Sequence, residues 1–452
     1  MGTAVATLGQ RLQLEVDSLG HQGQGVGRWQ GQVVFVPAAL PGETVQVRVR
    51  RLAKRHLEAE LLTVDSPSPA RRRPACILAE RCGGCSLLHC EDSTQADLKT
   101  DLVRQALERL GHLRAPVQPI WSAEDGLGYR NRALIPLERT AEGQLRAGYY
   151  RRGSHRIVNL NRCPVLDPRI DALIAPLKAE LESSGWPVDV NLSTSGGLRH
   201  LGLRVGHHSG EVLITLVSSH DQLPGLEALA QVWRQRWPQV VGVGLNLQPK
   251  ANNVIIGPET RCLSGRPWLV ERFTGIELRI GHDTFFQVNT PQAERLVNPL
   301  VDFFADASGP VVDAYCGIGT FSLPLAAAGA EVLGLEVHEA SVEQAIANAE
   351  RNHLPGARFE RADVAARLAE RLTTTAGLLV DPPRRGLSPE ALAAIQAGRP
   401  ARLAYISCNP ATMARDLGQL CVEGGYGLRR LQPVDFFPQT SHVECLALLE
   451  LT

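Results

Sequence analysis

The sequence predicts an α/β protein in three parts, and each part rests on one observation. Residues 1–66 hold short β-branched runs separated by glycines and prolines, a pattern typical of a small OB-like β-barrel. Residues 67–284 mix strand-like and helix-like segments around a cysteine-rich loop, which predicts a central α+β domain. Residues 285–452 alternate strands with helices, which predicts a Rossmann-like, doubly wound parallel sheet with ligands at the carboxyl ends of its strands.

The barrel prediction depends on four alternating or β-branched runs and on the turns between them. The expected strands cover residues 12–16, 33–36, 44–50 and 57–64. We expect turns at the glycines and prolines between these runs, which are Gly20, Gly23, Gly25, Gly27, Gly31, Pro37, Pro41 and Gly42.

The central region offers fewer signals. Apolar residues at helical spacing predict a helix over residues 95–110 that ends at Gly111. Its expected apolar stripe is Leu98, Leu102, Ala106 and Leu110. Strands near residues 213–217 and 241–247 should flank a helix near 226–233, but their topology does not follow from the pattern.

The carboxyl-terminal part alternates more regularly. Expected strands cover residues 310–314, 331–336, 358–361, 377–381, 402–407, 428–433 and 443–449. Expected helices cover residues 321–328, 340–352, 389–397 and 411–423.

Composition excludes several classes of protein. The chain of 452 residues is 44% hydrophobic and 21% charged, which is ordinary for a globular protein. No run reaches the roughly 18 apolar residues of a membrane helix, and residues 1–14 lack the features of a secretory signal. Its ten cysteines are then expected to be reduced thiols. We therefore expect a cytoplasmic monomer with no membrane contact and no protein partner.

Charge is balanced overall but segregated along the chain. Lys and Arg number 47, as do Asp and Glu. Residues 1–75 hold ten basic residues against six acidic ones, and residues 128–162 hold eight against two. Two basic segments on a neutral protein suit the binding of a polyanion such as RNA. On charge alone, a solvated surface stays an alternative.

The first candidate site is a glycine turn between a strand and a helix. Gly317 and Gly319 follow an apolar strand that carries Asp313, and Glu336 ends the next strand, where it could accept hydrogen bonds from ribose. Asp363 follows the third strand, where it could take an adenine amino group. The third glycine of the dinucleotide motif is missing, so the set favours S-adenosylmethionine over NAD. Each acid alone could instead be a helix N-cap.

A second group of residues predicts covalent chemistry. The prolines of Asp381-Pro382-Pro383-Arg384 should hold Asp381 rigidly at the ligand edge. Cys408 follows a strand and precedes a helix, whose dipole should lower the thiol pKa and favour a nucleophilic thiolate. Glu444 begins a late strand and could serve as a base with a raised pKa. The alternatives are a buried structural cysteine and a surface carboxylate.

The third candidate is a metal centre. Cys76, Cys82 and Cys85 lie close together with glycines between them, and either Cys90 or Cys163 could be the fourth ligand. Thiolate ligands suit zinc or an iron–sulfur cluster, and the spacing does not choose between them. The other cysteines are expected to be core or incidental residues: Cys262, Cys316, Cys421 and Cys445.

Taken in order, these motifs resemble the RNA uracil-5-methyltransferases over nearly the whole chain. The resemblance rests on Phe286-Gln287-Val288-Asn289, Asp313-Ala314-Tyr315-Cys316-Gly317, Asp381-Pro382-Pro383-Arg384, Ser407-Cys408-Asn409-Pro410 and His442-Val443-Glu444. The cysteine loop is similar to the iron–sulfur segment of the 23S rRNA branch, and the first 65 residues are similar to a TRAM domain, an RNA-binding barrel.

The resemblance implies a role for each matching residue. Cys408 matches the nucleophile and Glu444 the base. The matches to S-adenosylmethionine contacts are Gln287, Tyr315, Gly317, Thr320, Glu336, Asp363 and Asp381. The matches to [4Fe-4S] ligands are Cys76, Cys82, Cys85 and Cys163. Two positions depart from the family pattern: Thr320 stands where relatives often have Asn, and Pro382-Pro383 replaces Pro-Ala.

The resulting hypothesis is an S-adenosylmethionine-dependent enzyme that methylates C5 of a uridine in 23S rRNA through a covalent bond between Cys408 and C6. One alternative is the same reaction on the T-loop of tRNA. Another is a metal-stabilised RNA-binding protein without catalysis, which would need neither Cys408 nor Glu444.

Overall fold

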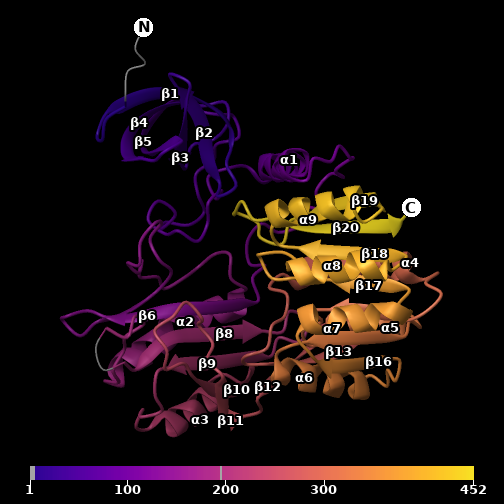
Figure 1. The fold of residues 1–452 in the computed structure, drawn as a ribbon. Helices are drawn as coiled ribbons and strands as arrows, with labels where there is room; N and C mark the ends of the chain where they lie inside the picture. The colour runs from indigo at the N-terminus through magenta and orange to yellow at the C-terminus, as the bar shows by residue number, and fades with distance from the viewer. Residues whose placement is uncertain (1–5, 194–195) are drawn as a thin grey trace.

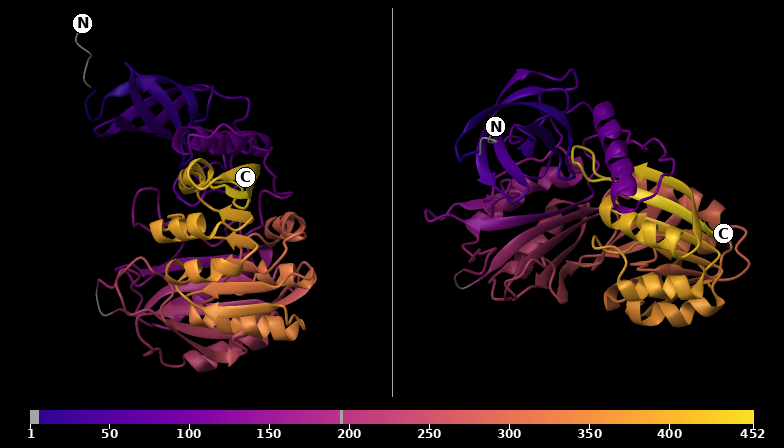
Figure 2. Two further views of the ribbon diagram at one scale, coloured as in Figure 1. Left: turned by 45° about the vertical axis from the view of Figure 1, so that its right-hand side comes forward. Right: turned by 45° about the horizontal axis from the view of Figure 1, so that its top comes forward.

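The computed structural model describes residues 6–193 and 196–452 in three parts. Residues 1–5 of the predicted barrel domain lie outside the described residues. Figure 1 and the right view of Figure 2 show a small barrel at one end, with a central sheet and a carboxyl-terminal sheet beside each other below it. None of the described helices is both long and apolar enough to cross a membrane.

The predicted N-terminal β-barrel is confirmed. Five strands close on themselves in the order β1-β2-β3-β5-β4. Alternating apolar side chains fill the interior, because neighbouring residues of a strand point to opposite faces. The strands are β1 (Arg11–Leu19), β2 (Gln24–Trp29), β3 (Gln32–Pro37), β4 (Thr44–Leu52) and β5 (His56–Ser66).

Strand β2 corrects one expectation, because its glycines were assigned to turns. Gly25 and Gly27 lie inside the strand and pair with β1 and β3. A Cβ atom on Gly27 would lie 2.3 Å from the carbonyl oxygen of Glu15. These glycines therefore mark the close approach of backbone segments in a small barrel rather than the ends of strands.

Helix α1 (Asp92–Leu110) exists as predicted, but it buries a different face. Its buried residues are Gln95, Lys99, Val103 and Leu107, whereas Leu110 is 50% exposed. The helix packs against α9 (Pro410–Val422) of the carboxyl-terminal part. Of the predicted stripe, Leu98, Leu102 and Ala106 are half-buried and only Leu110 is exposed, so the centre of the buried face lies one residue aside from the prediction, where two polar residues occupy its start.

The central part is a six-stranded sheet in the order β11-β10-β9-β8-β6-β7. Its apolar core includes residues of helices α2 (Pro168–Ser183) and α3 (Leu226–Arg236). The strands are β6 (Arg132–Arg139), β7 (Leu145–Ala147), β8 (Leu198–Val205), β9 (Val212–Ser218), β10 (Val240–Leu247) and β11 (Glu259–Gly265).

A short hairpin links the central part to the carboxyl-terminal part. Strands β12 (Trp268–Phe273) and β13 (Ile276–Gly281) pair with each other and with no other sheet of the described residues. Phe273 and Leu278 share an apolar cluster with Leu323 and Ile406 of the carboxyl-terminal part. The boundaries at 1–66, 67–284 and 285–452 stay a prediction, and this packing ties the hairpin to the third part.

The carboxyl-terminal sheet has seven strands in the order β16-β15-β14-β17-β18-β20-β19. Five strands are parallel, but β20 runs antiparallel to β18 and to β19, which corrects the expectation of a wholly parallel sheet. The strands are β14 (Val311–Ala314), β15 (Val332–Glu336), β16 (Ala357–Arg361), β17 (Gly377–Val380), β18 (Arg402–Ser407), β19 (Tyr426–Val434) and β20 (Glu444–Leu451). The further helices are α4 (Thr290–Phe304), α5 (Ser322–Ala327), α6 (Glu339–Arg351), α7 (Val364–Arg371), the 3₁₀ turn η1 (Leu372–Thr374) and α8 (Pro389–Gly398).

Candidate active site

The carboxyl ends of the parallel strands bring the predicted donor residues to one edge of the sheet. The turn after β14 begins at Tyr315, whose backbone has a left-handed φ of 71°. Gly317 and Gly319 follow with positive φ values, and Thr320 lies buried where the turn enters α5. Such a conformation exposes backbone N–H groups, because it reverses the chain within a few residues.

Two acidic residues approach this turn. The Oε2 atom of Glu336 accepts a hydrogen bond from the Gly317 N–H at 3.2 Å, and Oε1 accepts one from His338 at 2.8 Å. Asp363 caps α7 by accepting a bond from the Ala365 N–H at 2.9 Å. The N-cap alternative therefore holds for Asp363. Asp363 also lies near the donor turn, since burial and then the charge of Asp363 raise the pKa of Tyr315. A helix cap can still contact a ligand at the helix N-terminus.

Gln287 and Asp381 form a pair at the same edge of the sheet. The Nε2 atom of Gln287 donates to Oδ2 of Asp381 at 3.3 Å, and Gln287 is buried. Burial and the nearby Asp313 raise the pKa of Asp381 to about 7. Burial likewise raises the pKa of Asp313 to about 7, while Ser322 donates a hydrogen bond to it at 2.5 Å. Buried carboxylates of this kind gain from a cationic ligand.

Sheet register places Cys408 beside Glu444. Strand β18 ends at Ser407, which pairs with Cys445 on the antiparallel strand β20, so Cys408, which follows Ser407, lies next to Glu444, which precedes Cys445. The two residues are 36 positions apart in the sequence, and α9 and β19 lie between them. Glu444 is buried, whereas Cys408 is partly exposed. The structure thus brings together the two residues predicted to act on the base.

The electrostatics of Cys408 differ from the prediction. Burial, the charge of Glu444 and, more weakly, that of Asp381 raise the pKa of the Cys408 thiol to about 11. Arg384 opposes this shift, since its guanidinium is close to the thiol and hydrogen-bonds it. A lowered pKa was expected from the N-terminus of α9, but desolvation and a neighbouring carboxylate outweigh that dipole.

Glu444 follows the prediction more closely. Burial and the charge of Asp381 raise its pKa well above the ordinary value, and Arg384 lowers it only in part. A carboxylate with a raised pKa is a stronger base, because it binds a proton more tightly.

Cys408 and Arg384 line a pocket of about 400 Å³ that five further segments complete. These segments are the β1–β2 turn of the barrel with His21 and Gln22, the cysteine loop at Gly83, Gly84 and Ser86, helix α1 at Leu102 and Ala106, the start of α9 at Asn409, Pro410 and Ala411, and the loop before β20 from Thr440 to Val443. Sequence reasoning missed the barrel turn and α1, because nothing local in either segment indicates that it approaches Cys408.

Three thiols of the cysteine loop, those of Cys76, Cys82 and Cys85, lie near the thiol of Cys163. Burial raises the pKa of Cys85 to about 12 and that of Cys163 to about 11, and the other thiols, among them Cys76 and Cys82, contribute to both shifts. Cys90 instead lies buried in a small apolar cluster, and no cysteine contributes to its pKa shift. Sequence spacing alone did not distinguish Cys90 from Cys163 as the fourth ligand. The packing of Cys90 in a separate apolar cluster favours Cys163. Within the described part of the chain, no group of three or more His, Cys, Asp or Glu side chains could hold a metal ion.

Comparison with known proteins identifies the family. Residues 272–452 match the family described as tRNA (Uracil-5-)-methyltransferase, and residues 5–62 match the TRAM domain. An uncharacterized RNA methyltransferase of Parasynechococcus marenigrum is 54% identical over 98% of this chain and 96% of its own. One from Thermosynechococcus vestitus is 47% identical over 98% of both chains.

A solved structure agrees over the whole length. The crystal structure of Pyrococcus abyssi tRNA (uracil-54, C5)-methyltransferase in complex with S-adenosyl-L-homocysteine is 27% identical, with a TM-score of 0.77 over 97% of this chain and 99% of that one. The predicted resemblance to this family is therefore confirmed, while the 23S rRNA iron–sulfur branch stays a prediction. The chain belongs to the tRNA (uracil-5-)-methyltransferase family, as an S-adenosylmethionine-dependent RNA methyltransferase with an N-terminal TRAM domain.

Proposed function

We propose that the protein methylates C5 of a uridine in 23S rRNA, with Cys408 as nucleophile and Glu444 as base. The observation that carries the proposal is the antiparallel register of β18 and β20, which brings the buried Glu444 next to Cys408, a residue that lines the pocket. A protein that only binds RNA needs neither a reactive thiol nor a buried carboxylate at that place.

The donor side of the site suits S-adenosylmethionine, which supplies an activated methyl group when bound. Its cationic sulfonium complements the carboxylates at the sheet edge, since the half-buried Asp381 has a raised pKa and lacks a neutralising cation in direct contact among the described residues. The residues that we propose to hold it are Gln287, Tyr315, Gly317, Thr320, Glu336, Asp363 and Asp381.

On the acceptor side, C5 of uracil is a poor nucleophile until a group adds at C6. The Cys408 sulfur would form a bond to C6 as its thiol proton passes to solvent, and the electrons of the C5–C6 double bond would move towards the C4 oxygen. Carbon C5 would then take the methyl group as the bond between that group and the donor sulfur breaks, with S-adenosyl-L-homocysteine as the leaving group. Glu444 removes the proton from C5, the C5–C6 double bond re-forms, and the bond between sulfur and C6 breaks. The target base must first leave its stack to reach this pocket.

The catalytic assignment is tested by Cys408→Ala, with Cys262→Ala as the matched control because Cys262 is an exposed cysteine on β11. We expect Cys408→Ala to bind RNA normally and to form no 5-methyluridine, measured by mass spectrometry of digested RNA. Cys262→Ala should keep full activity. Methylation by Cys408→Ala at the normal rate would refute the assignment.

Two RNAs compete as substrate. The 23S rRNA follows from the resemblance of the cysteine loop, whereas the name of the Pyrococcus abyssi structure favours the T-loop of tRNA as a second candidate. Unmodified transcripts of both RNAs, given separately to the enzyme with labelled methyl donor, decide between them. Incorporation into tRNA alone would replace rRNA by tRNA as the substrate.

We also propose that Cys76, Cys82, Cys85 and Cys163 hold a [4Fe-4S] cluster. The support is the shared electrostatics of these thiols and the separate packing of Cys90. A four-iron cluster holds its cysteine sulfurs farther apart than a single ion does, so a loop unsuited to a single ion can still suit a cluster. Anaerobically purified protein should absorb broadly near about 400 nm, and Cys163→Ala should lose this band while Cys90→Ala keeps it. Colourless protein with stoichiometric zinc would refute the cluster.

A further inference from the structure

The loop between β19 and β20 shapes the pocket beside Cys408. It runs from Asp435 and ends directly at Glu444, and its residues from Thr440 to Val443 line the pocket. Gln439 in this loop has a left-handed backbone with a φ of 68°. Because residues other than glycine rarely adopt that conformation, neighbouring groups must hold the loop in place.

Lys99 of α1 is the first of these groups. Its side chain is fully buried, and Nζ donates to Oδ1 of Asp435 at 2.6 Å and to the carbonyl oxygen of Phe437 at 3.1 Å. Burial of an ammonium group is costly, and an apolar side chain at this place would pack without that cost. What the ion pair adds is a fixed position for two residues at the start of the loop.

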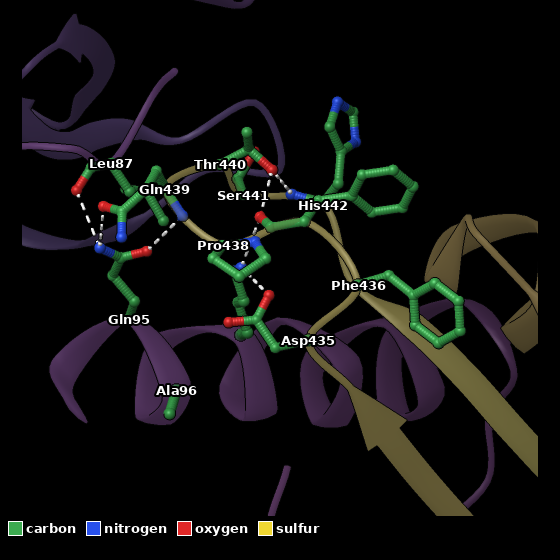
Figure 3. A network of polar contacts seen from close by, with 12 residues as sticks. Leu87, Gln95, Ala96, Asp435, Phe436, Pro438, Gln439, Thr440, Ser441 and His442 are labelled. Atoms are coloured by element: carbon green, nitrogen blue, oxygen red, sulfur yellow. Dashed lines mark hydrogen bonds and ion pairs between the residues drawn. The ribbon is translucent and has the colours of Figure 1, made fainter. Parts of the chain in front are cut away.

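Gln95, one helical turn earlier, holds the middle of the loop. Its Oε1 atom accepts a hydrogen bond from the N–H of Gln439 at 3.0 Å, and its Nε2 atom donates to Oε1 of Gln439 at 3.0 Å. From the cysteine loop, the N–H of Leu87 donates to the carbonyl oxygen of Gln439 at 2.9 Å. Figure 3 shows Gln95 rising from the helix towards Gln439, with Leu87 on the same side.

The same helix also forms a wall of the pocket. Leu102 lies three residues after Lys99 and Ala106 four residues after Leu102, spacings that place them on adjoining parts of one helix face, and both line the pocket that contains Cys408. Helix α1 therefore lines the pocket directly and also holds the β19–β20 loop, which lines it too, through Lys99 and Gln95.

We propose that Lys99 is a positioning residue for catalysis: through Asp435 and Phe437 it fixes the loop that presents the target base to Cys408 and Glu444. The role rests on the proposed function, because it presumes that the base binds in this pocket. Neither Lys99 nor its partners Asp435 and Phe437 are among the residues proposed to hold the methyl donor, so donor affinity should not depend on Lys99.

The test compares Asp435→Asn with Asp101→Asn. Both substitutions remove an aspartate that pairs with a cation; Asp435 is buried against Lys99, whereas Asp101 lies on the surface of α1 beside Arg104. We expect Asp435→Asn to lower kcat about tenfold to hundredfold, as misplacement of a reacting group does. Asp101→Asn should change kcat by less than about twofold, as an exposed ion pair does.

Two further measurements separate positioning from loss of fold. The dissociation constant of S-adenosylmethionine should stay within about twofold of wild type in both variants, as it does when a remote contact changes. RNA that carries 5-fluorouridine at the target position should form a covalent adduct with wild type, because fluorine cannot leave C5 as a proton does, and Asp435→Asn should form it more slowly.

A second variant keeps the test decisive if a lone buried charge prevents folding. Lys99→Met/Asp435→Leu removes both charges, so it should fold, bind the donor normally and still show the reduced kcat. If this double variant folds and methylates RNA at the wild-type rate, Lys99 has no positioning role. If wild type methylates RNA but forms no adduct, the covalent mechanism fails, and the methylation rates of the variants still decide the role of Lys99.

Discussion

The two halves of the site are assembled in different ways. The donor half is built by strand–turn–helix units of one sheet, in which Glu336 ends a strand and Gly317 and Asp381 follow one. The acceptor half is built by six segments from all three parts of the chain, and the hydrogen bond from Ser441 to the carbonyl oxygen of His21 joins residues 420 positions apart. Local order therefore suffices for the donor half, whereas docking of distant parts decides the acceptor half.

The largest effect is expected from Glu444→Gln, which keeps the shape of the acceptor half and removes its base. Turnover should fall by about 10²- to 10⁴-fold, the usual contribution of a general base. The adduct to Cys408 should then persist on ordinary RNA, because the C5 proton cannot leave, and denaturing gel electrophoresis would detect it. Glu450→Gln, on the same strand but paired with Arg429, is the control. Equal turnover in both variants would remove Glu444 from the mechanism.

Next in size is Asp381→Asn, which addresses the donor half. Loss of its charge should weaken S-adenosylmethionine binding about 10- to 100-fold, the range for a hydrogen bond to a charged group. Because the pKa of Asp381 is raised to about 7, its ionised form is lost as the pH falls through 7, so wild-type affinity should fall between pH 8 and pH 6.

The same titration separates Asp381 from other groups. Affinity of Asp381→Asn should change little across this pH range, and Asp306→Asn, far more exposed, should behave as wild type. Isothermal calorimetry measures all three. If the affinity of wild type for S-adenosylmethionine does not change with pH, Asp381 stays ionised over this range and is more exposed to solvent than the structure indicates.

The contrast between the halves also explains what the sequence could predict. Cys408 and most of the donor residues lie at or just after the ends of strands, so the strand pattern and a parallel topology predict that they share one edge of the sheet. A strand over residues 443–449 was predicted, but its antiparallel direction, which brings Glu444 next to Cys408, was not. Gly25 and Gly27 indicated turns because a glycine that avoids a backbone collision and a glycine that makes a turn look alike in sequence.

Helix α1 shows the limit most clearly. Its periodicity predicted a helix, but the buried face begins with Gln95 and Lys99, which no hydrophobic pattern selects. Their burial depends on partners at Gln439 and Asp435, more than 300 residues away. The direction of the Cys408 pKa shift was also predicted wrongly. Burial and the neighbouring Glu444 raise this pKa, and neither is visible in the local sequence.

A smaller effect is expected on the reactivity of Cys408, which reports the balance of charges in the acceptor half. The Glu444 charge raises the Cys408 pKa and Arg384 lowers it, so Glu444→Gln should speed alkylation at pH 8 and Arg384→Gln should slow it. Each unit of pKa changes the thiolate fraction by about tenfold. Mass spectrometry of the Cys408 and Cys262 peptides in one sample gives the rates, with Cys262 as the internal control. Shifts in the same direction for both variants would contradict the assigned charges.

The smallest effect is expected from Ser441→Ala, which loosens the contact between the two most distant parts of the acceptor half. Ser441 Oγ donates a hydrogen bond to the carbonyl oxygen of His21 in the barrel, and the variant keeps the separate bond that the Ser441 N–H donates to Ser86 Oγ at 3.0 Å. Loss of one hydrogen bond of about 0.5–1.5 kcal/mol should raise the KM for RNA a few-fold and leave the KM for the methyl donor unchanged. Thr440→Ser, which keeps a hydroxyl in the same loop, is the control. If the donor KM rises together with the RNA KM, the barrel turn supports both halves, and the division between a locally built donor half and a docked acceptor half does not hold.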